Sequence, residues 1–165
     1  GREGRDTLAK LAAADPSISV RAEACAALGS FNEPGDIPVL AAALGDKSGR
    51  VKLAAARSLA RRAGADSTAA LRAFLDKAPA PELALVAQAG LAERGETVDV
   101  GLADLTLGQG DPELKTLAIT VLRAARAPEA LELLSKAMRG DASQRIRVEA
   151  AAAVIVRLRR VEAPR

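Results

Sequence analysis

The chain has 165 residues, with 24 basic and 21 acidic side chains and a formal net charge of +3 at pH 7. Hydrophobic residues make up 49% of it and aromatic residues only 1%, with one cysteine and no histidine. This composition excludes an intrachain disulfide, the familiar cysteine and histidine metal sites, and catalysis that depends on histidine. Because most of the apolar residues are Ala and Leu, which favour helices, we expect a thin two-layer stack of helices.

Ten helices are predicted, arranged in pairs, and no segment has the alternation of a strand. The first helix of each pair is expected at residues 5–14, 36–45, 66–76, 98–107 and 128–139, and the second at residues 17–28, 48–63, 80–93, 111–125 and 143–159. Asp15 and Asp111 each precede a proline, which predicts an N-cap followed by proline at the first helical position. Five glycines are expected to end helices as left-handed caps: Gly29, Gly45, Gly64, Gly95 and Gly140.

An apolar residue recurs near the start of each second helix at intervals of 31 or 32 residues. These anchors are Val20, Val51, Leu83, Leu114 and Ile146. Four positions after every anchor comes an alanine, and eight positions after it comes a leucine or valine. A constant period of this length indicates a repeat array, in which each two-helix unit buries its apolar face against its neighbours.

The stretch from Asp15 to Ala24 resembles the opening of the second helix in HEAT-like repeats, most closely the short bacterial class named after phycobilisome lyases. Similar stretches begin at Asp46 and Asp141, whereas the fourth unit has Gln109 and the third has Ala78 at the aspartate position. The resemblance implies an all-α fold, a right-handed α-solenoid of about five HEAT-like helix pairs. It also implies a single repeat domain over residues 1–165, with repeats at about 5–29, 36–64, 66–94, 98–126 and 128–160.

In that family the first helices form the convex face and the second helices the concave face, and motif charges link adjacent turns. The resemblance therefore implies a structural charge ladder of Asp15, Arg21, Asp46, Lys52, Asp141 and Arg147. It further implies a protein–protein interaction scaffold without enzymatic activity or cofactor. A chromophore-lyase-like subunit is the enzymatic alternative, although the chain has no Trp, Tyr or His for a chromophore pocket. Cys25 lies in a run of small residues and is expected to be buried and inert.

The charges are unevenly distributed along the chain. From Lys47 to Arg62 there are six basic residues and no acid, and from Glu93 to Glu113 there are six acids and one arginine. Helical spacing places Arg50, Arg57 and Arg61 on one side of their helix, and we call these three the basic stripe. We call Glu93, Glu96 and Asp99 the acidic set. Together they predict a protein or peptide partner of mixed charge, with an ordinary solvated surface as the alternative.

Nucleic acid is a second alternative partner, bound through its phosphates by the basic stripe. The sequence disfavours it because aromatic residues for base stacking are missing and the acidic middle would repel a phosphate backbone. No apolar run is long enough to span a membrane. The last helix is apolar on more than one face, which predicts self-association or further repeats at the C-terminal end. The start at Gly1 indicates a processed chain or a fragment; the cytoplasm is favoured, and an exported mature protein stays open.

Overall fold

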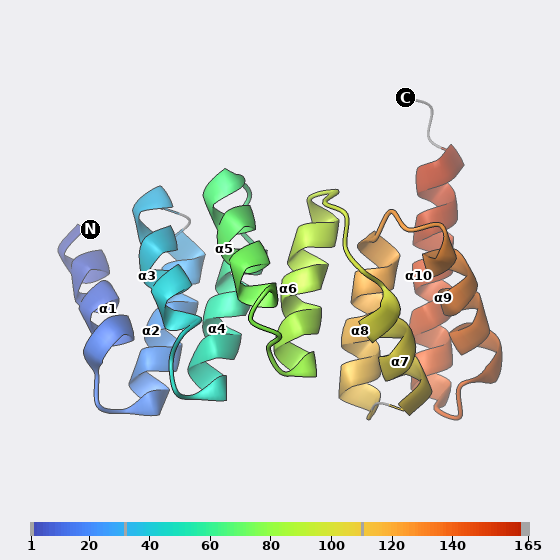
Figure 1. Ribbon diagram of the computed structural model, residues 1–165, viewed down its shortest axis with the longest axis horizontal. Coiled ribbons are helices and arrows are strands. Elements are labelled where there is room, and N and C mark those ends of the chain that lie inside the picture. Colours follow the sequence, from blue (N-terminus) through green and yellow to red (C-terminus); the bar gives the residue numbers. More distant parts are fainter. Residues whose placement is uncertain (1, 32, 110, 163–165) are drawn as a thin grey trace. The chain divides into compact units, whose positions relative to one another are not determined.

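The computed structural model describes residues 2–31, 33–109 and 111–162, and these residues form helices and no strand. Figure 1 shows the helices in chain order. Their bounds are α1 Arg2–Ala14, α2 Ile18–Phe31, α3 Ile37–Ala43, α4 Gly49–Ala60, α5 Ala65–Leu75, α6 Pro81–Glu93, α7 Gly101–Gln109, α8 Pro112–Ala124, α9 Glu129–Gly140 and α10 Gln144–Glu162. A short 3₁₀ helix, η1 at Pro34–Asp36, precedes α3. The predicted all-α fold of about five helix pairs is confirmed.

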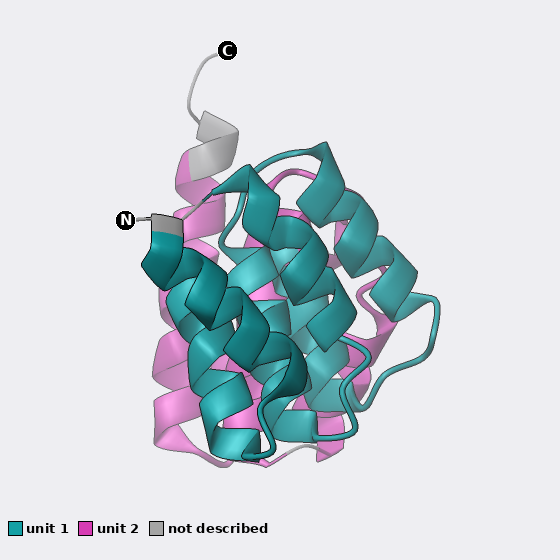
Figure 2. Ribbon diagram, turned by 90° about the vertical axis from the view of Figure 1, so that its left-hand side faces the viewer, with its two compact units in different colours: residues 1–90 teal, residues 91–165 magenta. Residues whose placement is uncertain are grey.

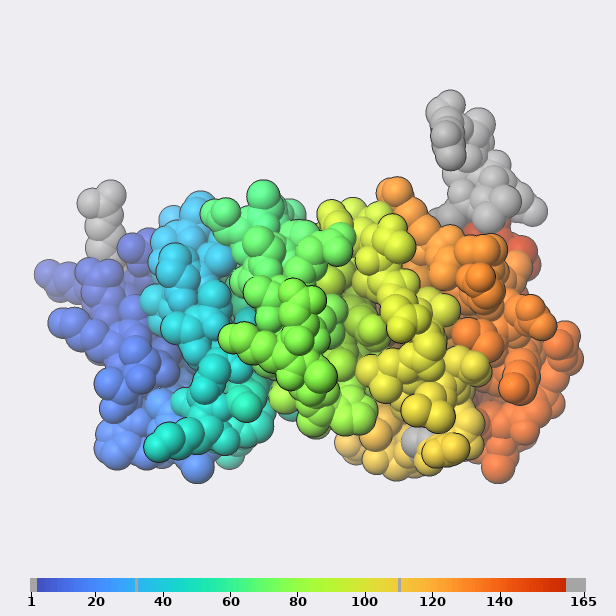
Figure 3. All heavy atoms as spheres, in the orientation of Figure 1, coloured from blue at the N-terminus to red at the C-terminus, as the bar shows by residue number. Residues whose placement is uncertain are grey.

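The chain divides into two compact units, residues 1–90 and 91–165 (Figure 2). In unit 1, α2 packs against α4, while α1, α3 and α5 form the other layer, a continuous surface in Figure 3. In unit 2, α8 packs against α7, α9 and α10. Within each unit the helix pairs therefore stack in two layers, as in an α-solenoid. No helix among the described residues is long and apolar enough to cross a bilayer.

The repeated small residue explains how the second helices approach one another. The alanine four positions after each anchor is buried in all five pairs: Ala24, Ala55, Ala87, Ala118 and Ala150. The leucines eight positions after the first four anchors, Leu28, Leu59, Leu91 and Leu122, are also buried. Alanine costs no side-chain entropy and lets helix backbones come close, while leucine fills the space between the two layers.

Gly29 shows that the prediction of glycine caps was only partly right. Gly95 has a positive φ of 78° and follows the end of α6, as expected. Gly64 has a φ of 120°, but it is the N-cap of α5, and α4 has already ended at Ala60. The prediction was wrong for Gly29, which lies inside α2, and for Gly45 and Gly140, whose φ angles are not positive. At Gly29 the requirement is space, since an added Cβ would lie 2.3 Å from the Oγ of Ser58 on α4.

The two Asp-Pro pairs have different roles. Asp111 is the N-cap of α8, where its side chain accepts hydrogen bonds from the backbone N–H groups of Glu113 and Leu114, as predicted. Asp15 was wrongly predicted as a cap, because α2 begins only at Ile18. Its Oδ1 instead accepts a hydrogen bond from the Ser17 N–H at 2.8 Å and holds the turn that leads into the helix.

Candidate functional site

Arg50 and Arg57 of the basic stripe lie on the exposed side of α4, and Arg61 directly follows the helix as its C-cap residue. All three side chains reach solvent. Arg50 contacts α2, with Nη2 3.4 Å from Glu23 Oε1 and Nη1 3.3 Å from Ser19 Oγ. Arg57 contacts α6, with Nη2 4.0 Å from Glu82 Oε1. The charged groups of these pairs are about half exposed or more. Exposed ion pairs of this kind contribute roughly 0–1 kcal/mol each, so a partner's charges can replace them at small cost.

Arg62 belongs to the same basic run but has a different role, which the sequence analysis missed. It is only 2% exposed, and its guanidinium donates to the backbone carbonyls of Leu28 and Glu33, each at 2.6 Å. Asp36 is equally buried and lies 3.5 Å from Arg62 Nη2 and 3.6 Å from Arg5 Nε. Arg62 therefore satisfies the carbonyl end of α2 and is part of the core of unit 1.

The register of the repeats contained a signal for this role. Arg62 and Arg157 each stand eleven positions after their anchor, and each binds the carbonyl eight positions after the preceding anchor. Arg157 donates to the carbonyls of Leu122, at 2.9 Å, and Ala125 at the end of α8. The arginine side chain thus provides donors for helix-terminal carbonyls, which lack partners within the helix.

The acidic set lies in unit 2, around the end of α6 and the start of α7. Glu93 lies 3.6 Å from Arg123 of α8, in a pair that is about half exposed. Asp99 Oδ1 accepts a hydrogen bond from the Gly101 N–H at 2.9 Å, where α7 begins. Glu96 is half-buried. Glu93 accordingly resembles the exposed pairs of unit 1, whereas Asp99 also has a local structural role.

Two charge contacts join successive helix pairs at the starts of the second helices. Arg21 binds Asp46 through two hydrogen bonds, Nε to Oδ2 at 2.8 Å and Nη2 to Oδ1 at 3.0 Å. Lys115 Nζ donates to Asp141 Oδ2 at 2.7 Å. The hydrogen bond from Arg21 lowers the pKa of Asp46 below its ordinary value, and that from Lys115 does the same for Asp141. Lys52 is the equivalent basic residue of α4, but the next helix pair has Ala78 in place of the aspartate.

A groove runs between two second helices of unit 2, α8 and α10, with a volume of about 270 Å³. Ile119, Ala152 and Val156 provide its apolar lining. Glu149 stands at its side, where it accepts hydrogen bonds from Thr116 Oγ1 and Arg145 Nε, each at 2.8 Å. The groove combines an apolar surface with polar edges, as peptide-binding surfaces do.

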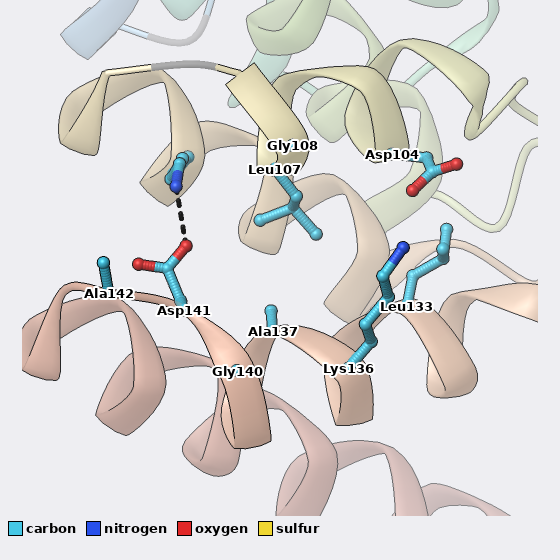
Figure 4. A pocket seen from close by; sticks show the side chains of 10 residues that line it. Asp104, Leu107, Gly108, Leu133, Lys136, Ala137, Gly140, Asp141 and Ala142 are labelled. Carbon is cyan, nitrogen blue, oxygen red and sulfur yellow. Dashed lines mark hydrogen bonds and ion pairs between the residues drawn. The ribbon is translucent and has the colours of Figure 1, made fainter.

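A larger hollow of about 400 Å³ lies between α7, α9 and the turn before α10 (Figure 4). Leu107, Leu133 and Ala137 line it, and Asp141 at one end turns toward Lys115. Lys136 and Asp104 lie at the other end. Because the Lys115–Asp141 pair already neutralises the first end, Lys136 and Asp104 are the charged groups through which a ligand would be oriented.

A third hollow, of about 530 Å³, lies at the C-terminal ends of helices in unit 2 and is lined by Arg94, Arg126 and Arg157. The Arg126 guanidinium lies against Gly95, where an added Cβ would be 2.4 Å from Nη2. Arg157 is engaged with the end of α8, as described above. The described residues contain no group of three or more His, Cys, Asp or Glu side chains suited to hold a metal ion.

Cys25 is fully buried in α2, as predicted. Burial raises the pKa of its thiol to about 11. The reactive form of cysteine is the thiolate, which is scarce at neutral pH when the pKa is this high. Cys25 therefore belongs to the packing of the helix pair, and its environment provides no activation as a nucleophile.

Residues 5–92, slightly more than half of the chain, match the family model for HEAT repeats. The match begins in α1 and ends in α6, so it covers the helix pair that contains the basic stripe. It identifies HEAT repeats in general, and the closer resemblance to the phycobilisome-lyase class stays a prediction. No curated protein matches the sequence significantly.

Proposed function

Because the chain belongs to the HEAT repeat family, whose members generally act as protein-interaction scaffolds, we propose that it binds a protein or peptide through its second helices. The partner carries charges of both signs and docks on a preformed surface without any bond being made or broken. The basic stripe and the acidic set supply contacts in their own units. We further propose that the helix pairs form a right-handed superhelix and that the second helices line its concave face.

The observation that carries the proposal is the pairing of the exposed charges in unit 1. Arg50 and Arg57 of α4 reach acids on two neighbouring second helices, Glu23 on α2 and Glu82 on α6. Their pairs are weak and solvated, so carboxylates of a partner can exchange with Glu23 and Glu82. Such exchange sets the register and the association rate of a complex more than its affinity.

The groove between α8 and α10 supports the same use of the second helices in unit 2. It offers an apolar surface where a partner side chain can be desolvated, beside the exposed pair of Arg123 and Glu93. Desolvated apolar anchors provide most of the affinity of a typical interface, while the surrounding charges add specificity. Ile119 and Val156 are the residues that we expect to contact such an anchor.

The test is affinity capture from a lysate of the source organism with three baits: the unaltered chain, the double variant Arg57→Glu/Arg61→Glu, and a control. The control, Lys10→Glu/Arg139→Glu, makes the same change in charge on the first helices α1 and α9. We expect the stripe variant to lose a partner that the other two baits retain, with unchanged helicity by circular dichroism. Retention of every captured protein by the stripe variant would refute the role of Arg57 and Arg61.

The two alternatives have their own readouts. A mobility-shift assay at low and moderate salt tests nucleic acid, and a shift that the stripe variant abolishes would replace the protein-binding proposal. Coexpression with a phycobiliprotein tests the lyase-like alternative, since attachment of a chromophore would give a coloured product. We expect neither result.

A further inference from the structure

A recurring pattern of contacts is found at the start of three of the five second helices, α2, α4 and α10. The sequence Asp-x-Ser occurs there three times, and in each case the aspartate Oδ1 accepts a hydrogen bond from the serine N–H, at 2.7–2.8 Å. The aspartates are Asp15, Asp46 and Asp141. At Asp46 and Asp141 the other oxygen, Oδ2, accepts a hydrogen bond from a basic residue of the preceding pair, Arg21 or Lys115. We call this contact a joint. Its basic half is the Arg or Lys of one helix pair, and its acidic half is the Asp-x-Ser turn of the next pair.

The basic half recurs at Arg147 of α10. Arg147 Nη1 donates to the carbonyls of Asp141, at 2.7 Å, and Ala142, at 3.2 Å. Arg21 Nη1 donates in the same way to Asp15, at 2.9 Å, and Pro16, at 3.3 Å. In Arg21 the Nε and Nη2 edge then binds Asp46, whereas in the described part of the chain no carboxylate accepts a hydrogen bond from that edge of Arg147.

α10, which carries Arg147, also has exposed apolar residues on the side where a following helix pair would pack. Val148 and Ile155, two and nine positions after the anchor Ile146, are 61% and 52% exposed. The equivalent positions in α2 are Ala22 and Gly29, which are buried on the helix that packs against α4. On α2 these positions face the next helix pair. On α10 the same positions carry large aliphatic side chains that are exposed to solvent.

The acidic half recurs at the other end of the chain. Asp15 Oδ1 binds the Ser17 N–H, and no cation among the described residues donates a hydrogen bond to its Oδ2. Ile18 and Val20 beside it are 48% and 36% exposed. Val20 is the anchor of α2, and the equivalent anchors Val51 and Ile146, each of which has a preceding helix pair, are completely buried. The chain thus carries both halves of one joint, an acidic half on α2 and a basic half on α10.

We propose that two copies of this chain associate head to tail, with Arg147, Val148 and Ile155 of one copy docked on Asp15, Ile18 and Val20 of the other. The contact repeats the Arg21–Asp46 joint between molecules. It buries the aliphatic side chains at both ends of the chain. It also lets the guanidinium of Arg147 donate two hydrogen bonds to the Asp15 carboxylate of the other copy, as arginine and carboxylate groups commonly do. Because the two surfaces differ, the contact is heterologous and can add further copies.

The experiment is sedimentation velocity over about 10 μM to about 1 mM, a range that detects weak association. We expect the unaltered chain to sediment faster as its concentration rises. Ile155→Lys, or Val148→Lys as a second variant, and separately Val20→Lys should each weaken association about tenfold or more. Leu105→Lys is the matched control, since Leu105 is 58% exposed on α7, outside both surfaces, and should leave association unchanged.

Mixing the variants identifies the geometry of the contact. Ile155→Lys blocks the α10 surface of one molecule, and Val20→Lys blocks the α2 surface of the other. A mixture of the two keeps one intact joint and should form one-to-one dimers and nothing larger. Undiminished association of Val20→Lys alone would show a symmetric contact and overturn the proposal. A chain that stays monomeric throughout the range would also overturn it, and would leave these surfaces to helix pairs of another polypeptide segment.

Discussion

Arg62 and Asp36 form a buried ion pair in unit 1, with Arg62 Nη2 3.5 Å from Asp36 Oδ2 and both side chains almost inaccessible to solvent. The same guanidinium binds the carbonyls of Leu28 and Glu33. It therefore connects the end of α2, the following turn and η1. Removing one partner of such a group leaves buried polar atoms without compensation, which costs more than the pair itself contributes.

We expect Arg62→Met to lower the free energy of unfolding by about 3–5 kcal/mol, as for other broken buried pairs. Urea denaturation followed by circular dichroism measures this. The control is Arg61→Met, one residue away and exposed, which should change stability by about 0.5 kcal/mol or less. Equal effects of the two variants would show that the contacts of Arg62 contribute nothing particular to unit 1.

Gly29→Ala tests the close approach of α2 and α4. Alanine is a better helix former than glycine by about 1 kcal/mol, so helix propensity alone predicts a more stable protein. The added Cβ, however, would lie 2.3 Å from Ser58 Oγ and 2.7 Å from Ser58 Cβ. We expect the crowding to prevail and Gly29→Ala to destabilise unit 1 by about 1–3 kcal/mol in thermal or urea unfolding.

Two companion variants make this prediction specific. Gly49→Ala, in the first turn of α4, adds a methyl group with no atom within 4 Å and should be neutral or slightly stabilising. Adding Ser58→Gly to Gly29→Ala should recover part of the lost stability because it removes the clashing atoms. A stabilised Gly29→Ala single variant would show that the two helices can separate without cost.

Cys25 should be unreactive in the folded protein. Its thiol is completely buried, and burial raises its pKa to about 11, so both access and thiolate are lacking near pH 8. We expect iodoacetamide to label the folded chain far more slowly than the chain in urea, with mass spectrometry as the readout. Comparable rates in the two conditions would mean that α2 opens readily.

The inter-repeat pairs should make stability depend on acid pH. The pKa of Asp46 and that of Asp141 are lowered in the folded state, so both carboxylates stabilise the fold above the unfolded value, about 3.9. This contribution is lost as the pH falls through the folded pKa. We expect the melting temperature to change little between pH 7 and pH 5 and to fall below about pH 4.

Asp46→Asn and Asp141→Asn isolate the two pairs. Each should lower the melting temperature at pH 7 and reduce its further loss between pH 5 and pH 3. Asp66→Asn, which alters an exposed aspartate on α5, serves as the control and should reproduce the pH profile of the unaltered chain. Profiles of Asp46→Asn and Asp141→Asn that parallel the unaltered one would mean that other carboxylates cause the acid dependence.

The sequence by itself determined the class of fold and the division into helix pairs. The anchors at 31- or 32-residue intervals, with alanine four positions later, are visible without coordinates because every unit meets the same packing requirement. The ends of the predicted helices lie close to the observed ones for the same reason. Exposure of Arg50, Arg57 and Arg61 also followed from helical spacing, since these positions lie beside the buried ones.

Only the tertiary structure decided which charged residues are structural and which are exposed. Arg61 and Arg62 are neighbours in the sequence, yet Arg61 reaches solvent and Arg62 is buried against the preceding helix pair. Gly29 likewise read as a helix end but provides space for Ser58. In both cases the deciding atoms belong to another repeat, about 30 residues away, and local periodicity describes one helix without describing what packs against it.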